Sequence, residues 1–261
     1  MLMRRSASFL LSSAALVIIA QLACAEARLT RIANDVKVLR PSAPPRAAAA
    51  NEILPSGVAL ETGASSQADV RFDNGALVRL GSNSVFAFTG SPRRMGLARG
   101  AMLVRAPRGA GEVRVATGKV TSVVGGTTAL VEHYPEAYIK LISVEGRPRM
   151  FMRGKLGESV LLEPGQLMMF HTKPAPKSLP NPVDIDIQRL MATSLLIKDL
   201  PPLGNEASIV RGAKTQSKQK SDGTLADTNL VIYGRGTLVS LVPPGEGQVS
   251  PTPTPSPKAK R

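Results

Sequence analysis

The stretch VRFDNGALVRLGSNS, residues 70–84, decides the fold of this chain. Two runs of alternating apolar residues flank the turn sequence Asp-Asn-Gly. Asn-Gly between alternating strands is the strongest short-range signal for a β-hairpin, because both residues accept the positive φ of a type I′ turn. The stretch therefore predicts two strands joined by a type I′ turn at Asn74 and Gly75.

The same pattern continues in both directions from this hairpin. Short apolar runs separated by glycine fill the chain from about residue 29 to residue 172. Turn signals recur about every 8 to 12 residues, and helical periodicity is absent, which is typical of all-β proteins. We therefore predict an all-β domain at residues 28–172, built as a roll, a sandwich or a short solenoid of Gly-punctuated strands.

The composition changes after this domain. Residues 173–204 begin with the proline-rich stretch KPAPKSLPNP, which is typical of an extended linker. One helix is predicted near residues 183–200, where apolar residues recur at about 3.6-residue spacing. Asp184 and Asp186 stand where acids favour a helix N-terminus, and a Pro-Pro pair follows the pattern.

The remaining residues, 205–261, are mostly polar. They end in SPTPTPSPKAKR, a low-complexity sequence of Pro, Thr and Ser with a basic tip. We expect this segment to be mostly disordered, with room for one short hairpin at residues 229–242.

The first 27 residues have the three parts of a secretory signal peptide. Two arginines precede an apolar run, and small residues follow it. The run is shorter than the roughly 20 residues that span a membrane comfortably. We expect cleavage after Ala25 or Ala27 and export to the periplasm or cell envelope of a bacterium. The mature protein would then have no membrane span.

Cys24 is the only cysteine of the chain, and it offers an alternative to simple cleavage. A lipoprotein would keep this residue as its lipidated N-terminus, although Gln21 stands where such signals usually have leucine. Cleavage after either alanine instead leaves a mature protein without a thiol. Disulfides, cysteine-metal sites and thiol nucleophiles are then excluded.

The charge of the chain is strongly basic. Lys and Arg number 33 against 19 Asp and Glu, which gives a net charge of +14. A basic exported protein attracts anionic partners, so we expect an envelope protein or an anionic envelope polymer as the partner. Aromatic residues make up 3% and Trp is absent, which argues against the base stacking that single-stranded nucleic acid requires.

One stretch concentrates this charge. Residues 93–114, RRMGLARGAMLVRAPRGAGEVR, contain six arginines and one acid. Guanidinium groups suit bidentate contacts with phosphate or carboxylate, whereas the alternative is solvated strand faces and protected sheet edges. The candidate contact residues are Arg93, Arg94, Arg99, Arg105 and Arg108. A second basic cluster contains Arg147, Arg149, Arg153 and Lys155.

Motifs for catalysis or metal binding are not found. His133 and His171 are the only histidines, and neither has a metal-ligand spacing. Asp184 and Asp186 would point to different sides of a helix. The glycine-rich stretches lack the lysine or the helix of a phosphate loop, and no nucleophile elbow occurs. The sequence therefore predicts no catalytic residue, no metal site and no cofactor, and the chain is not expected to be an enzyme.

Five ordered segments carry a resemblance to a known family. They are LETGASSQADVRFDNGALVRLGSNS, LARGAMLV, VATGKVTSVVGGTTALVE, ISVEGRPRM and VLLEPGQ. The residues at the family's expected points are Gly63, Phe72, Gly75, Leu80, Gly100, Thr117, Gly126, Thr127, Glu145, Gly146, Gly165 and Gln166. From about residue 54 to residue 166 the chain resembles the FecR domain, the periplasmic part of bacterial iron-dicitrate-type regulators. This resemblance implies signalling or scaffolding.

The resemblance is limited to the middle of the chain. Regulators of sigma factors that share it also have a cytoplasmic anti-sigma segment and a membrane span. With a signal peptide from residue 1, only MLMRR would remain cytoplasmic, so no direct contact with a sigma factor is expected.

Three hypotheses of function remain. The first is an exported, non-enzymatic FecR-domain protein that acts as a binding or interaction module of the periplasm or envelope. The second is a periplasmic sensor of a sigma-factor signalling system that works through a separate membrane partner. The third is a polyanion or cell-wall binding protein.

The signal peptide predicts the N-terminus of the mature protein. Protein purified from its native host should begin at Glu26 or Arg28, because signal peptidase cuts after small residues. Intact-mass measurement checks this expectation. Retention of Met1 would contradict it, and a diacylglyceryl group on Cys24 would identify a lipoprotein.

Overall fold

The computed structural model describes residues 27–225 except for 92, 156 and 175. In this part of the chain there are 17 strands and two helices. The first nine strands are β1 (Ala27–Ala33), β2 (Val36–Leu39), β3 (Arg46–Ala47), β4 (Ile53–Leu54), β5 (Ala59–Thr62), β6 (Gln67–Phe72), β7 (Leu77–Leu80), β8 (Val85–Phe88) and β9 (Arg94–Ala106). The others are β10 (Val113–Thr117), β11 (Val120–Val124), β12 (Thr127–Tyr134), β13 (Tyr138–Glu145), β14 (Arg149–Met152), β15 (Ser159–Leu161), β16 (Gln166–His171) and β17 (Val183–Asp184). The helices are α1 (Ile187–Thr193) and α2 (Glu206–Ser221). The predicted all-β body is confirmed.

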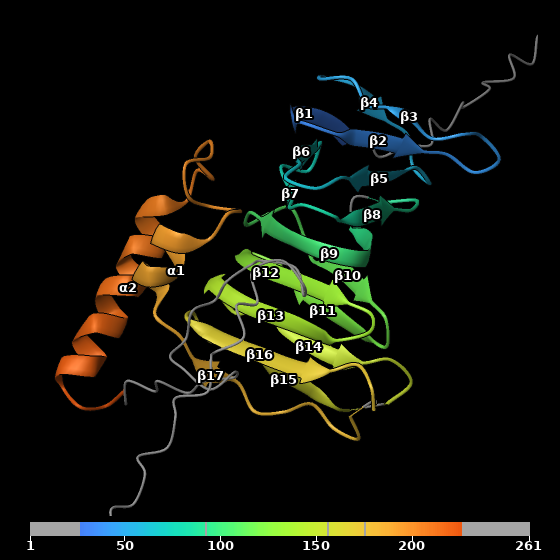
Figure 1. Cartoon of the computed structure of the whole chain (residues 1–261). Coiled ribbons are helices and arrows are strands. Elements are labelled where there is room, and N and C mark those ends of the chain that lie inside the picture. Colours follow the sequence, from blue (N-terminus) through green and yellow to red (C-terminus); the bar gives the residue numbers. More distant parts are fainter. Residues whose placement is uncertain (1–26, 92, 156, 175, 226–261) are drawn as a thin grey trace, which may run out of the picture.

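The strands form two sheets that share β9 (Figure 1). The sheet beside the helices, here called the helix-side sheet, has the order β4-β1-β6-β7-β9-β12-β13-β16-β17. The other, here called the groove-side sheet, has the order β3-β2-β5-β8-β9-β10-β11-β14-β15. All neighbours are antiparallel except β9 and β10, which run parallel. Of the three predicted arrangements, the structure has the sandwich.

Two hydrophobic cores hold these layers together. The larger core lies between the sheets, and a second core lies between the helix-side sheet and the helices. Strand alternation assigns neighbouring residues to different cores. In β12, for example, Ala129 and Val131 belong to the first core and Leu130 to the second. In β10, Val113 and Val115 point inward, and Arg114 between them is exposed.

β9 changes sheets at Gly100. Its first part pairs with β8 and β10, and its second part pairs with β7 and β12. Gly100 has φ +96°, and a Cβ atom there would lie 2.5 Å from Ser84 Cα. Any larger residue would meet both a strained backbone and the neighbouring chain. The corner of the sandwich therefore requires glycine.

The hairpin of β6 and β7 is confirmed, but the predicted turn type is wrong. Only Gly75 has a positive φ (82°), whereas a type I′ turn also needs one at Asn74. The Gly75 N–H donates to the Phe72 carbonyl at 2.9 Å, which gives a three-residue loop closed by a left-handed glycine. The Asn74 side chain explains the difference, because its Oδ1 accepts from the Ala76 N–H and its Nδ2 donates to the Ala110 carbonyl.

The prediction of a single helix near residues 183–200 is corrected. Asp186 does cap α1, since its side chain accepts a hydrogen bond from the Arg189 N–H at 2.9 Å. The helix nevertheless ends at Thr193, because Ser194 is extended and starts a turn that buries Leu196 against the helix-side sheet.

The expectation of disorder from residue 205 is wrong for residues 206–221, which form α2. Ile209 and Gln216 are its buried residues. The Gln216 side-chain amide donates to the Ile185 carbonyl and accepts from the Ile187 N–H, so a polar residue docks this helix. The sequence of α2 therefore lacks the apolar stripe on which helix prediction depends.

Two further predictions fall outside the described residues: the signal peptide up to residue 26 and the hairpin at 229–242. Ala27, the last residue of the predicted signal, already belongs to β1 and is paired with Leu54 and Phe72. Among the described residues, neither helix has the length and apolar character needed to cross a membrane.

Gly75→Val tests the hairpin loop. Valine must adopt a positive φ there, and its Cβ would touch Pro107, so we expect a loss of about 1 to 3 kcal/mol in the free energy of unfolding. Gly96→Val is the matched control. Gly96 does not have a positive φ, and a Cβ atom there would lie 4.0 Å from its nearest neighbour, the Ala116 carbonyl oxygen. Thermal and denaturant melts measure both. Equal stability of the two variants would contradict the loop geometry.

Candidate functional site: a basic groove

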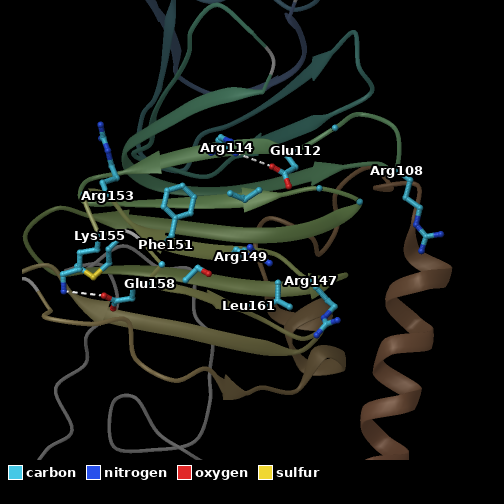
Figure 2. A pocket seen from close by; sticks show the side chains of 18 of the residues that line it. Arg108, Glu112, Arg114, Arg147, Arg149, Phe151, Arg153, Lys155, Glu158 and Leu161 are labelled. Atoms are coloured by element: carbon cyan, nitrogen blue, oxygen red, sulfur yellow. Dashed lines mark ion pairs between the residues drawn. The ribbon is translucent and has the colours of Figure 1, made fainter.

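A hollow of about 910 Å³ lies on the outer face of the groove-side sheet and is here called the basic groove (Figure 2). Residues of β10, β11, β14 and β15 form its lining, together with the β9–β10, β11–β12, β13–β14 and β14–β15 loops. Its cationic residues are Arg108, Arg114, Arg147, Arg149, Arg153 and Lys155. Its carboxylates are Glu112 and Glu158. The groove is therefore strongly basic.

Strand register places these side chains together. Arg114 in β10 is paired with Val123 in β11, Val123 with Arg149 in β14, and Arg149 with Leu161 in β15. Paired residues point to the same face of a sheet, so these four side chains form one outward row. Neighbouring strands lie about 4.8 Å apart, so two strand spacings of about 9 to 10 Å separate the backbones of Arg114 and Arg149.

The cations of the groove are only partly neutralised. Arg114 Nη2 lies 3.5 Å from Glu112 Oε2, Lys155 Nζ lies 3.5 Å from Glu158 Oε2, and Arg147 Nη2 lies 2.5 Å from Glu163 Oε1. These pairs are at least partly exposed and hold little energy. Within residues 27–225, with the stated gaps, no ion pair is found for Arg108, Arg149 or Arg153. These three guanidinium groups are therefore available to an anionic ligand.

The floor of the groove is apolar. Val123, Phe151 and Leu161 line it and are each half-buried. In Figure 2, Arg149 lies between Phe151 and Leu161, and the other charged side chains surround these three residues. The site thus offers guanidinium groups for anions and a small apolar surface for carbon-rich groups.

A smaller hollow of about 630 Å³ continues the basic surface. It shares Glu112 and Arg114 with the basic groove and adds Arg93 and Arg94. The parallel pairing of β9 and β10 places Arg94 directly beside Arg114. The two hollows therefore form one positively charged face.

The structure divides the five arginines predicted as contact residues. Arg93, Arg94 and Arg108 line the two hollows. Arg99 lies apart from them, and its Nη2 is 2.6 Å from Glu61 Oε1. Arg105 lies on the helix-side sheet, close to Gly204. The change of sheet at Gly100 explains the position of Arg105 alone, because Arg99 precedes this glycine and Arg108 lies in the loop between β9 and β10.

Sequence reasoning did not combine the second basic cluster with the first. Arg147, Arg149, Arg153 and Lys155 line the same hollow as Arg108 and Arg114. The apolar floor was not recognised at all. Its only sequence signal is the outward register of Val123, Phe151 and Leu161, which requires the pairing of β11, β14 and β15 to be known.

The two histidines lie away from the groove lining. His133 is buried, and its Nδ1 is 2.8 Å from the Leu97 carbonyl oxygen. His171 is exposed, with Nδ1 3.3 Å from the Ala137 carbonyl oxygen. Over the part of the chain that the structure describes, no group of three or more His, Cys, Asp or Glu residues is placed to hold a metal ion.

Residues 58–147 match the family described as "FecR protein". The chain therefore contains a FecR domain. The match includes the β6–β7 hairpin, the corner at Gly100 and the part of the basic groove that carries Arg108 and Arg114. β14 and β15, which complete the groove, lie beyond it.

Two solved structures are similar to this chain. Both are crystal structures of a protein from Parabacteroides distasonis ATCC 8503 described as a "putative anti-sigma factor". Each is 16% identical, with a TM-score of 0.44, over 51% of this chain. The matched parts cover 63% and 62% of those chains, so this chain spans less than two thirds of their length. No curated protein sequence matches the chain.

His133 makes the stability of the fold depend on pH. Burial disfavours the imidazolium and lowers the pKa of His133, although the Leu97 carbonyl acts in the opposite direction. Below about pH 6.5 the unfolded chain binds a proton at this residue more readily than the folded chain does. The free energy of unfolding should therefore fall as the pH is lowered from about 7.5 towards the depressed pKa of His133.

His133→Gln should remove this part of the pH dependence, whereas the exposed His171→Gln should keep it. Melts of the wild type and both variants between about pH 5 and 8 provide the measurement. A wild-type pH profile that survives in His133→Gln would refute the role of this histidine.

Proposed function

We propose that this chain is an exported, non-enzymatic FecR-domain protein that acts as a binding module in the periplasm or cell envelope, with the basic groove as its binding surface. The observation that carries the proposal is the groove itself, which six cations and two carboxylates line, and three of these cations have no ion pair among the described residues. Such a field attracts and holds an anionic partner.

The chemistry of the lining supports binding rather than catalysis. Five of the six cations are arginines, whose guanidinium groups are permanent cations with hydrogen-bond donors only. They can orient an anion through bidentate hydrogen bonds, but they do not exchange protons with it. The FecR domain agrees with this proposal, since its resemblance implies signalling or scaffolding rather than chemistry.

Export is supported by the sequence of the first 27 residues. Ala27 is buried and is paired with Phe72 in the helix-side sheet. A cut after Ala27 would remove this pairing, whereas a cut after Ala25 would keep it. We therefore favour Glu26 as the first residue of the mature protein.

The FecR domain also favours a second candidate, a periplasmic sensor for a sigma-factor signalling system that works through a separate membrane partner. Gene neighbourhood separates the two. Adjacent genes for a sigma factor and an outer-membrane receptor favour the sensor, and a location among envelope genes favours the binding module.

The binding role is tested by retention of envelope material on the immobilised mature protein at low and high salt. Retention should fall steeply with salt, because counterions compete for the cationic surface. Arg114→Gln, Arg149→Gln and Arg153→Gln together should reduce it about tenfold at low salt.

The matched control carries Arg40→Gln, Arg71→Gln and Arg189→Gln, three exposed arginines outside both hollows. It loses the same charge and should retain envelope material like the wild type. Equal retention by the two triple variants would disprove a role of the groove.

A further inference from the structure

We propose that the basic groove binds an extended segment of a partner protein in which acidic and apolar residues are mixed. This inference rests on the proposed function and names the chemistry of the partner. It follows from the spread of the cations, the apolar floor and the two carboxylates among the cations.

The cations are too far apart for one small anion. The row from Arg114 to Leu161 crosses three strand spacings, or about 14 Å. In Figure 2, Arg153 and Lys155 lie at one end of the groove, and Arg108 and Arg147 lie at the other. An extended peptide advances about 3.3 Å per residue, so four or five residues would cover the row. The occupant is therefore elongated and carries several anionic groups.

The floor requires apolar groups in the same occupant. Val123, Phe151 and Leu161 remain partly exposed between the cations. A ligand gains about 25 cal/mol for each Å² of apolar surface that it covers. A uniformly hydrophilic polyanion, such as a phosphate polymer, cannot make this gain. Phe151 is the one aromatic residue among those that line the groove, so a ladder of stacked bases or sugars is not supported either.

Glu112 and Glu158 also favour a mixed sequence. Both carboxylates line the groove, each within 3.5 Å of a cation. They repel a polymer with an anion at every unit, whereas a peptide can place an apolar or neutral residue beside them. A lipid bilayer fits less well, because the apolar residues form the floor of a hollow that a flat surface does not enter.

The test uses a fluorescent eight-residue peptide of alternating Glu and Leu and measures its affinity for the full mature chain. Octaglutamate, an alternating Lys-Leu peptide, inorganic polyphosphate and vesicles containing phosphatidylglycerol are the comparison probes. The Glu-Leu peptide should bind at least about fivefold more tightly than octaglutamate, because it alone covers the floor. The Lys-Leu peptide should not bind.

Two groove variants separate the contribution of the cations to the binding affinity from that of the apolar floor. Arg114→Gln with Arg149→Gln should weaken both acidic peptides about tenfold, whereas Arg40→Gln with Arg71→Gln should change neither. Phe151→Ala should weaken the Glu-Leu peptide about fivefold and leave octaglutamate unchanged. Melting curves establish that each variant is folded, and Leu161→Ser replaces Phe151→Ala if that variant is not.

Equal affinity for the two acidic peptides, unchanged by Phe151→Ala, would overturn the inference in favour of a plain polyanion. Tighter binding of polyphosphate or of the vesicles would overturn it as well. If the Glu-Leu peptide does not bind while envelope material is still retained through the groove, the inference fails and the proposed function stands.

Discussion

The left-handed backbone at Gly100 is the constraint on which the architecture depends. It turns β9 out of one sheet and into the other while the strand passes close to Ser84. The first part of β9 then pairs with β10 in parallel, and the β10–β11 hairpin provides one wall of the basic groove. The second part pairs with β12, which faces the helices. Gly100 therefore determines which strands pair with β9 in the groove-side sheet and which pair with it in the helix-side sheet.

The buried guanidinium group of Arg79 holds the segment between the two helices against the helix-side sheet. The side chain of Arg79 is 1% exposed, and its Nε and Nη2 each lie 3.0 Å from an oxygen of Asp69. The remaining hydrogen bonds go to the carbonyls of Leu196 and Pro201, in the segment between α1 and α2. Loss of the Asp69 carboxylate would leave the Arg79 guanidinium buried without an ionic partner, at a cost of about 3 to 5 kcal/mol. The pair therefore ties the helices to the helix-side sheet, and the groove occupies the opposite outer face.

The strands can be predicted from the sequence more reliably than the helices. Period-2 alternation and the Asp-Asn-Gly turn predict the hairpin of β6 and β7, because both signals are local. α2 escapes prediction because its docking depends on Gln216, whose amide replaces the apolar contact that a helical pattern would show. α1 is shorter than its pattern because the chain must turn to bring the Leu196 carbonyl to Arg79. Both errors have a tertiary cause that no local pattern contains.

The position of the groove also depends on tertiary structure that no local sequence pattern contains. The concentration of arginine in residues 93–114 is visible in the sequence, but the division of these arginines among the two hollows, Glu61 and the helix-side sheet is not. Arg114 and Arg149 lie in the same row only because β11 stands between their strands. Outward positions of a sheet can change without disturbing the core, whereas the corner glycine and the inward valines cannot. The fold of the FecR domain therefore fixes where side chains point, and the residues on the outer face determine what they bind. In this chain that face combines guanidinium groups that have no ion pair among the described residues with an apolar floor, and the partner that we propose supplies both acidic and apolar groups.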